Sequence, residues 1–196
     1  MEQLILIVMK RFLALMAFQA LIVPFISAQV KFTADTEQTS ILWLGEKVTG
    51  QHGGTIKLLS GWINWVDNKI ISGEFNIDMT SLKVSEANER LEGHLKSDDF
   101  FGVAKFPVSK LIISGSTPFD KGTGVVKGTL TIKGITNPIE FKVVSQKKDD
   151  GMWYFANITV DRTKYDIRYG SGNFFDNLGD KTIFDEFKLK VSLFVN

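Results

Sequence analysis

Residues 73–79 read Gly-Glu-Phe-Asn-Ile-Asp-Met, and this stretch decides the fold class. Apolar side chains stand at Phe75, Ile77 and Met79, and polar side chains occupy the positions between them. Because successive side chains of a β-strand point to opposite faces, this alternation gives the strand one dry face and one wet face. The stretch therefore predicts a strand that covers an apolar interior.

Runs of the same kind recur through the chain after residue 28. The run from Phe187 to Val195 alternates apolar residues with lysine and serine, and Val126–Ile132 alternates in a similar way. Further strands are expected at Thr39–Lys47, Gly54–Trp65, Val108–Ser114, Ile139–Ser145 and Trp153–Asp161. About eight short strands, separated by turns rich in Asp, Asn and Gly, predict an all-β fold that is either a closed antiparallel barrel or a sandwich.

One stretch between the strands has a helical pattern, from Ser85 to Lys96. Leu91 and Leu95 are spaced i, i+4 and so share one face, while glutamates occupy other positions. Ser85 is suited to cap the helix N-terminus. A short helix is therefore expected here.

The N-terminal residues form a separate segment. Lys10 and Arg11 precede an apolar run from Phe12 to Ile26, and the small residues Ser27 and Ala28 follow it. This order is typical of a secretory signal peptide, so we expect residues 1–28 to be removed and residues 29–196 to form one domain that is periplasmic or secreted, with no stable membrane span after removal. The alternative is a retained membrane anchor, since residues 4–26 are long enough to cross a bilayer.

The composition argues against several classes of function. Without residues 1–28, the chain has equal numbers of basic and acidic residues, so it lacks the positive charge of a typical nucleic-acid binder. It has no cysteine, which excludes disulfides, thiol catalysis and thiolate metal sites. His52 and His94 are the only histidines and are distant in sequence, which is a poor metal signal. The segment around Ser171 lacks the spacing of a nucleophile elbow. No metal and no cofactor are expected.

The aromatic composition bears on what the barrel would contain. Phe occurs 16 times and Tyr only 3 times. Eight-stranded barrels are either filled by side chains or hold one small ligand. A lining rich in Phe suits a hydrocarbon ligand, because it asks for no hydrogen bonds. An ordinary side-chain core explains the same Phe residues, so the composition leaves both interpretations open.

Four stretches carry a family resemblance. They are Leu91–Pro107, which reads LEGHLKSDDFFGVAKFP, together with Ser40–Gly61, which includes the run Val48–Gly61, and Gly128–Ile139 and Asp161–Gly170. Taken in their order along the chain, they resemble the YceI-like proteins, the lipocalin-like polyisoprenoid-binding family. The resemblance implies an extended eight-stranded antiparallel barrel, an apolar tunnel for an isoprenoid or fatty chain, and no enzymatic step. Asp166 stands where the family often has Gly, and Thr39-Ser40 stands where it commonly has His-Ser.

The resemblance and the strand alternation together nominate ligand-binding residues. These are Trp43, Phe75, Ile77, Met79, Phe100, Phe101, Phe106, Leu130, Ile132, Phe187, Leu189 and Val191. His94 and Arg162 are candidates for a polar tunnel mouth. Each has a structural alternative, since His94 would also suit the C-terminal end of the helix and Arg162 would also pair with Asp161.

Other residues leave two interpretations open. Phe174 and Phe175, beside the flexible Gly170–Gly172 segment, would form either a lid over a barrel mouth or an ordinary surface loop. The four tryptophans would either line the tunnel or flank its openings. Asp98-Asp99 is more typical of a solvated turn than of acid catalysis.

Three functional hypotheses follow. The leading one is an exported, non-enzymatic protein that sequesters or transports an isoprenoid or other long-chain lipid. The second is an envelope stress-response or structural protein whose barrel is filled by side chains. The third is an enzyme acting on a lipid or quinone, with His94, Asp98 and Arg162 gathered at one mouth. The sequence leaves open which lipid is bound and whether the protein is a homodimer.

Overall fold

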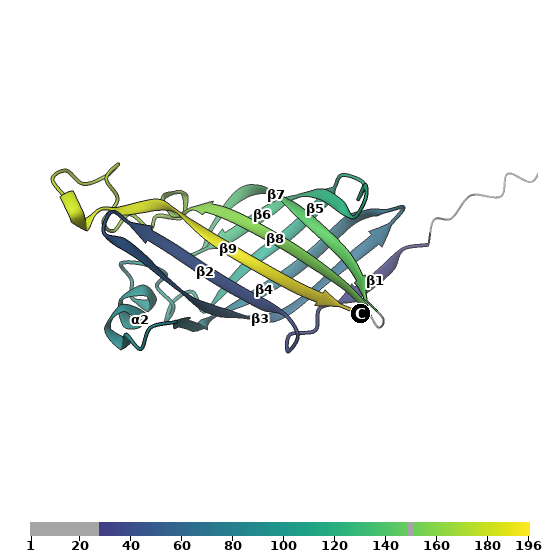
Figure 1. Cartoon of the computed structure of the whole chain (residues 1–196), viewed down its shortest axis with the longest axis horizontal. Coiled ribbons are helices and arrows are strands. Elements are labelled where there is room, and N and C mark those ends of the chain that lie inside the picture. Colours follow the sequence, from purple (N-terminus) through teal and green to yellow (C-terminus); the bar gives the residue numbers. More distant parts are fainter. Residues whose placement is uncertain (1–27, 149–150) are drawn as a thin grey trace, which may run out of the picture.

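The computed structural model describes residues 28–148 and 151–196, and its architecture is shown in Figure 1. The predicted signal peptide lies outside the described residues, apart from Ala28. The strands are β1 (Val30–Thr33), β2 (Ser40–Lys47), β3 (Gly50–Val66), β4 (Lys69–Val84), β5 (Val108–Ser116), β6 (Thr123–Ile132), β7 (Ile135–Lys148), β8 (Gly151–Asp161) and β9 (Ile183–Val195). The helices are α2 (Glu89–Lys96) and the short 3₁₀ turns η1 (Arg162–Tyr165) and η2 (Gly179–Lys181).

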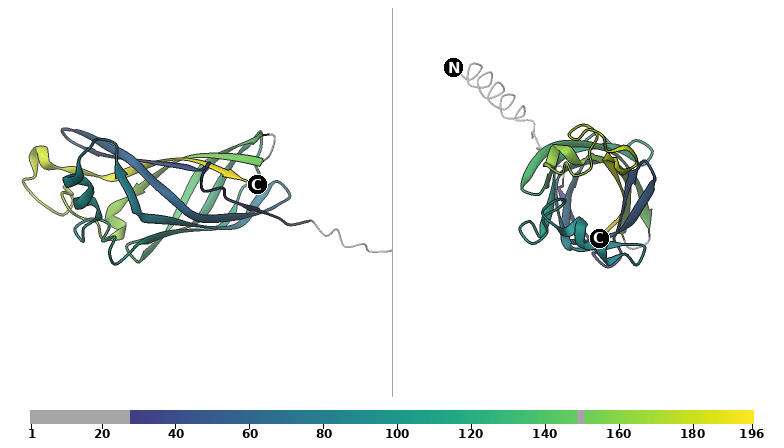
Figure 2. Two further views of the ribbon diagram at one scale, coloured as in Figure 1. Left: turned by 90° about the horizontal axis from the view of Figure 1, so that it is seen from below. Right: turned by 90° about the vertical axis from the view of Figure 1, so that its left-hand side faces the viewer.

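The strands form a closed antiparallel barrel. From β2 to β9, each strand pairs with the next along the chain, and β9 pairs back onto β2, with Ser40 opposite Ser192 and Gly45 opposite Phe187. These eight strands confirm the predicted barrel. Its long axis runs from the α2 end to the end that holds the C-terminus (Figure 2).

β1 is an additional strand that the sequence pattern did not reveal. It pairs with the last part of β3, and Thr33 exchanges backbone hydrogen bonds with Asn196 at 2.9 and 3.1 Å. β1 and β2 therefore pair with two different parts of the same side of β3, and together they form one interrupted strand of the barrel. The break lies at Asp35, whose carboxylate accepts hydrogen bonds from the N–H groups of Glu37 and Gln38. Four residues are too few to show a period, so alternation could not identify β1.

The central strands are longer than the alternation predicted. β3 spans 17 residues, but its register against β4 shifts between Leu58 and Ser60. The extra residue at this bulge leaves Leu59 outside, with 55% of its surface exposed, although its neighbour Leu58 is buried. A bulge of this kind interrupts the two-residue period within the predicted run. The additional residues of β3 lie outside that run, mainly at Gly50–Gly53, where the sequence has no alternating apolar residues.

The predicted helix from Ser85 to Lys96 begins later than expected. The N–H of Ser85 donates to Gly53 O at 2.8 Å and so extends the sheet instead of capping a helix. Asn88 is the cap, and its side chain accepts a hydrogen bond from Leu91 N at 3.0 Å. Because the backbone of Ser85 pairs with β3, the prediction that Ser85 caps the helix N-terminus was wrong.

Glu92 fastens α2 to the barrel. Its Oε1 accepts hydrogen bonds from Lys83 Nζ of β4 and Lys96 Nζ of the same helix, both at 2.9 Å. These two ammonium groups lower the pKa of Glu92 to about 2, with Lys96 contributing more than Lys83. The charged form of Glu92 therefore stabilises the folded protein.

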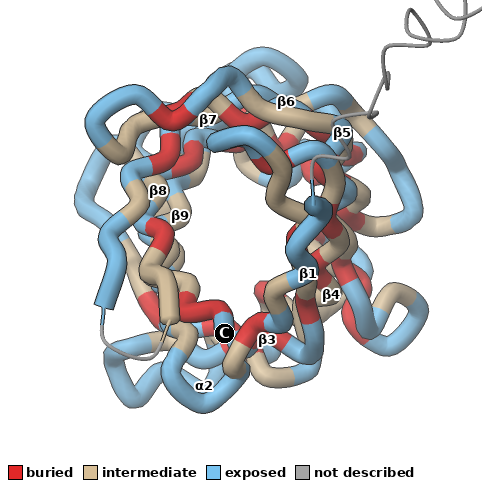
Figure 3. Tube along the Cα trace, turned by 90° about the vertical axis from the view of Figure 1, so that its right-hand side faces the viewer, coloured by how far each residue is buried: buried red, intermediate tan, exposed pale blue. Residues whose placement is uncertain are grey.

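The two barrel ends differ in what they carry. The end reached by β2, β4, β6 and β8 carries α2, η1, η2 and the loop between η1 and β9, and we call it the helical end (Figure 1). The opposite end carries the β3–β4 turn, the β5–β6 turn and Asn196, and we call it the terminal end. Figure 3 views the molecule from the terminal end, where buried and exposed positions alternate along the strands. Within residues 28–148 and 151–196, no helix has the length and hydrophobicity of a membrane span.

Replacing Gly61 by valine is expected to destabilise the barrel by about 1–3 kcal/mol, the usual cost of overpacking. Gly61 lies opposite Phe75, and the Phe75 ring covers the position that a Cβ atom would occupy. Gly45→Val is the matched control, because no atom lies within 4 Å of a Cβ at Gly45. Urea denaturation of both variants measures the difference, and equal midpoints would contradict the close packing at Gly61.

Glu92→Gln is expected to lower the melting temperature at pH 7. The folded pKa of about 2 lies below the ordinary value of 4.5, so the stabilisation by Glu92 is present above pH 4.5 and is lost as the pH falls toward 2. The difference between wild type and variant should therefore shrink over this range in thermal melts. Glu89→Gln, in the same first helical turn, is the control. A difference that stays constant with pH would rule out the ionic origin.

Candidate ligand-binding tunnel

The barrel encloses an apolar cavity of about 250 Å³. Side chains from strands β2 to β9 line it, and Leu91 and Leu95 of α2 and Phe100 and Phe101 add to the lining at the helical end. For comparison, an apolar protein cavity of about 150 Å³ is enough to bind benzene. The interior is therefore not completely filled by side chains.

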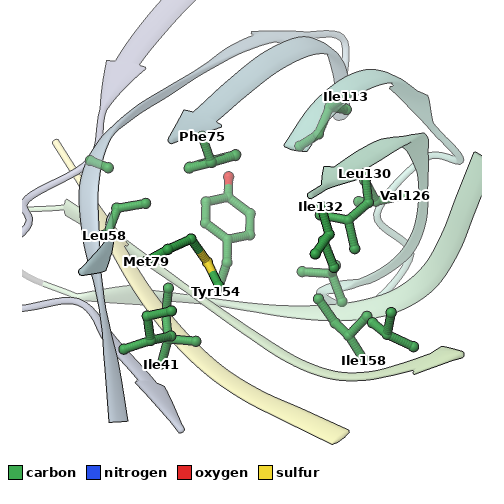
Figure 4. Close-up of a cluster of buried hydrophobic side chains, with 14 of the residues drawn as sticks. Ile41, Leu58, Phe75, Met79, Ile113, Val126, Leu130, Ile132, Tyr154 and Ile158 are labelled. Carbon is green, nitrogen blue, oxygen red and sulfur yellow. The ribbon is translucent and has the colours of Figure 1, made fainter. Parts of the chain in front are cut away.

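Strand alternation explains the apolar lining. On β4, Phe75, Ile77 and Met79 face the cavity. On β9, Phe187 and Leu189 face it, whereas Lys188 and Lys190, which alternate with them, are exposed. Figure 4 shows how side chains from opposite walls point toward one another, among them Leu58 and Met79 on one side and Leu130 and Ile132 on the other. The face that each strand turns inward is thus settled by the barrel closure.

Most of the nominated ligand-binding residues line this cavity. Those that do are Trp43, Phe75, Ile77, Met79, Phe100, Phe101, Leu130, Ile132, Phe187, Leu189 and Val191. Phe106 is not among the lining residues. Its ring lies over Gly102 and Gly134, where it packs the loop after α2 against the β6–β7 turn.

The cavity also has lining residues that the sequence reasoning did not nominate. They include Ile41, Ile56, Leu58, Ile63, Ile70, Leu82, Ser109, Leu111, Ile113, Val126, Ile139, Phe141, Val143, Tyr154, Ala156, Ile158 and Leu193. Most belong to the predicted strands and share a face with a nominated residue or alternate in the same way. Extending the alternation to every strand would have found most of them, but not Ile63, Ile70 and Leu82, whose parity is reversed where the register between β3 and β4 shifts.

The charged lining residues and His52 gather at the helical end. Glu46, Lys47 and His52 come from the β2–β3 hairpin, and Glu186 comes from the start of β9. Glu46 pairs with Lys188 at 2.8 Å, and His52 Nδ1 lies 3.7 Å from Glu86 Oε1. This end therefore has a mixed polar rim.

Arg162 organises this rim from a buried position. Its Nη1 donates to the carbonyl oxygens of Ile167 and Tyr169 at 2.7 and 2.9 Å. Its Nε and Nη2 donate to the carbonyls of Phe184 and Ile183, both at 3.0 Å, and Nη2 also lies 3.4 Å from Asp185 Oδ1. Burial lowers the pKa of Arg162, and the nearby Asp185 and Asp161 oppose this shift. Arg162 thus joins the loop after η1 to the start of β9.

The nominated ion pair between Asp161 and Arg162 is not the one that forms. Arg162 pairs with Asp185, whereas Asp161 Oδ1 accepts hydrogen bonds from the N–H and hydroxyl of Thr163 and so caps η1. A guanidinium group has five N–H donors, and the contacts of Arg162 use that number. No donor of Arg162 is left over for a phosphate in this conformation.

His94 lies behind the lining rather than in it. Its ring packs edge-on against Phe100 at 5.2 Å and against Tyr169 at 4.5 Å between centroids, and its Nε2 is 3.8 Å from Asp99 Oδ2. His94 lies in the last turn of α2, at the helix C-terminus as predicted. Ser97 caps this terminus, because its N–H and hydroxyl both donate to the carbonyl of His94. His94 therefore supports the position of Phe100.

The Phe174-Phe175 loop does not form a lid over the cavity. Phe174 and Phe175 are exposed and do not line the cavity, and Arg168 lies over the Phe174 ring at 4.7 Å.

Among the tryptophans, Trp43 lines the cavity and donates from Nε1 to Lys83 O at 3.0 Å. Trp62 lies under Lys31, and Trp153 stacks on Phe155.

Three aromatic rings pack together at the terminal end of the cavity. Trp65 and Phe119 lie 5.1 Å apart between centroids, and Phe119 packs edge-on against Tyr154 at 5.9 Å. Tyr154 lines the cavity, but Trp65 and Phe119 do not. These three rings therefore form a floor, with Tyr154 on its inner side.

The fold and cavity have known relatives. A family model described as the YceI-like domain matches residues 32–195. The chain belongs to the YceI-like family. A UPF0312 protein of Pseudomonas putida is 26% identical over 100 residues, which cover 51% of this YceI-like chain and 52% of the relative. The chain thus spans about half the length of the curated relatives it matches.

Two solved structures share the YceI-like fold. BcnA of Burkholderia cenocepacia superposes with a TM-score of 0.70 at 19% identity, over 83% of this chain and 99% of BcnA. A polyisoprenoid binding domain from Saccharophagus degradans superposes with a TM-score of 0.63 at 16% identity, over 84% of this chain and 97% of that domain. These similarities confirm the lipocalin-like barrel that the sequence predicted.

Arg162→Lys is expected to destabilise the YceI-like barrel by about 2–4 kcal/mol, because several buried carbonyls lose a charged hydrogen-bond donor. Arg168→Lys is the matched control, since Arg168 is exposed and pairs with Asp166 at the surface. Chemical denaturation compares the two variants. If both lose the same small amount, the contacts of Arg162 do not hold the loop.

Proposed function

We propose that this YceI-like protein is an exported, non-enzymatic binding protein that sequesters or transports an isoprenoid or other long-chain lipid in its tunnel. The observation that carries the proposal is the apolar cavity of about 250 Å³, lined from every strand of the closed barrel. The similarity in fold to a polyisoprenoid binding domain supports the same ligand class.

The energetics of burial suit such a ligand. Each methylene taken from water contributes roughly 0.8 kcal/mol. A chain of about ten or more carbons therefore offsets an association cost of about 4–15 kcal/mol without any specific polar contact. The apolar lining provides this burial.

The second candidate, an envelope or stress-response barrel filled by side chains, is disfavoured by the cavity. A filled barrel would bring side chains from opposite walls into contact along its whole length. Here Leu58 and Leu130, from opposite walls, both line free space. The carrier therefore fits the interior better.

The non-enzymatic part of the proposal rests on how the three candidate catalytic residues are used. Asp98 is exposed and pairs with Lys105 at 2.6 Å. The donors of Arg162 serve the loop backbone, and His94 packs behind Phe100. Each of these residues has a structural role, and they do not converge on the cavity as one group.

The ligand is identified by native mass spectrometry of the mature protein, purified from its own or a related host. We expect a discrete adduct that extracts into organic solvent as a polyprenyl or acyl chain. Export is tested on the same material, since cleavage after Ala28 leaves Gln29 as the first residue. A protein that stays empty when offered such lipids would favour the side-chain-filled barrel.

Ala156→Trp is expected to abolish or strongly reduce lipid uptake, because Ala156 lines the cavity and a tryptophan there fills it. Asn157→Trp is the matched control, since Asn157 is the next residue on β8 and faces solvent. Binding of a fluorescent polyprenyl or fatty-acyl probe measures both. Equal uptake by the two variants would place the ligand outside the barrel.

A further inference from the structure

Tyr154 is a polar exception within the apolar tunnel. Only 4% of its surface is exposed, and its ring lines the cavity. Its hydroxyl is buried and has no hydrogen-bond partner among the described residues. Figure 4 shows this hydroxyl pointing across the barrel interior toward Phe75. An unsatisfied buried hydroxyl disfavours the folded state, so its presence calls for an explanation.

The rings packed against Tyr154 offer no polar group in compensation, and Thr39, a polar lining residue at the same end, already accepts a hydrogen bond from Phe194 N at 3.3 Å. Phe119 and Trp65 pack against its ring from the terminal end, and apolar Ile63, Ile70 and Ile113 line the same part of the cavity. A single ordered water would need two to four polar partners to be held there. One hydroxyl among apolar side chains does not supply them.

The charge of the missing partner follows from the placement of the charged lining residues. Glu46, Lys47, Arg162 and Glu186 all lie at the helical end, away from the Tyr154 floor. A carboxylate or phosphate at the floor would be buried without a counter-charge, which is costly. Burial also raises the pKa of Tyr154, so its hydroxyl stays protonated and remains a donor. An uncharged oxygen acceptor is the group that this floor suits.

We propose that Tyr154 is the specificity-determining residue of the tunnel and donates a hydrogen bond to an uncharged oxygen at the deep end of the bound lipid. The oxygen belongs to a carbonyl, ether or hydroxyl group, while the remainder of the lipid is hydrocarbon. This assignment rests on the proposed carrier function, because it names a chemical feature of the ligand that the tunnel holds.

The test compares two probes with the same carbon skeleton, a polyprenyl methyl ketone and the hydrocarbon in which a methylene replaces the carbonyl. Wild-type protein is expected to bind the ketone about tenfold more tightly, the effect of one buried hydrogen bond. Tyr154→Phe should remove this preference by weakening the ketone alone. Tyr165→Phe is the control, since Tyr165 is also buried but does not line the cavity.

Stability of the empty protein gives a second readout. Because the hydroxyl is unpaired, Tyr154→Phe should leave the melting temperature of lipid-free protein unchanged or raise it. A marked fall would show that the hydroxyl has a partner within the protein and would overturn the assignment, as would equal wild-type affinity for the two probes or a ketone preference that survives in Tyr154→Phe. If wild type binds neither probe nor any other long-chain lipid, the carrier function itself fails and the assignment falls with it.

Discussion

The pairing of β9 with β2 is the interaction on which the rest of the structure depends. Every other neighbouring pair from β2 to β9 joins strands that follow each other in sequence, whereas this pair joins the two ends of the sheet. Without it, both strands would be exposed edges with unpaired backbone groups. Closure also fixes which face is inside, since Trp43 lies opposite Leu189 and Ile41 opposite Val191, and all four line the cavity. The tunnel is therefore a direct consequence of closing the sheet.

Closure explains why the interior can remain partly empty. The number of strands sets the width of a barrel, and eight strands leave an interior that side chains fill or that one small ligand occupies. The backbone ladder does not depend on that interior being filled, because its hydrogen bonds run around the wall. Stability is then supplied by the wall, by the aromatic floor of Trp65, Phe119 and Tyr154, and by the contacts of Arg162 at the opposite end. The central part of the tunnel is left available for a guest.

The alternation of apolar and polar residues predicted which side chains of a regular strand share a face. It did not predict caps, ion pairs and bulges, because these depend on residues that are distant in sequence. The two-residue spacing of Phe75, Ile77 and Met79 predicts that they share the apolar face of one strand. Leu59 breaks that spacing at a bulge, and β1 is too short to show any spacing. Asn88 and Ser85 are both reasonable helix caps by residue type, and the choice between them depends on the hydrogen bond from Ser85 to Gly53. Likewise, the pairing of Arg162 with Asp185 rather than Asp161 requires a loop to fold back over the barrel end.

The polar groups of the tunnel are distributed unequally, and this gives it a direction. Glu46, Lys47 and Glu186 provide ionic groups at the helical end, where a charged or hydrated head group would remain in contact with solvent. The terminal end provides a neutral hydroxyl from Tyr154, held against the aromatic floor. Burial of hydrocarbon alone would hold a chain equally well in either orientation, because the hydrophobic effect has no direction. The difference between the two ends is therefore what would orient a lipid in the barrel, and the residues responsible are few and lie outside the apolar majority of the lining.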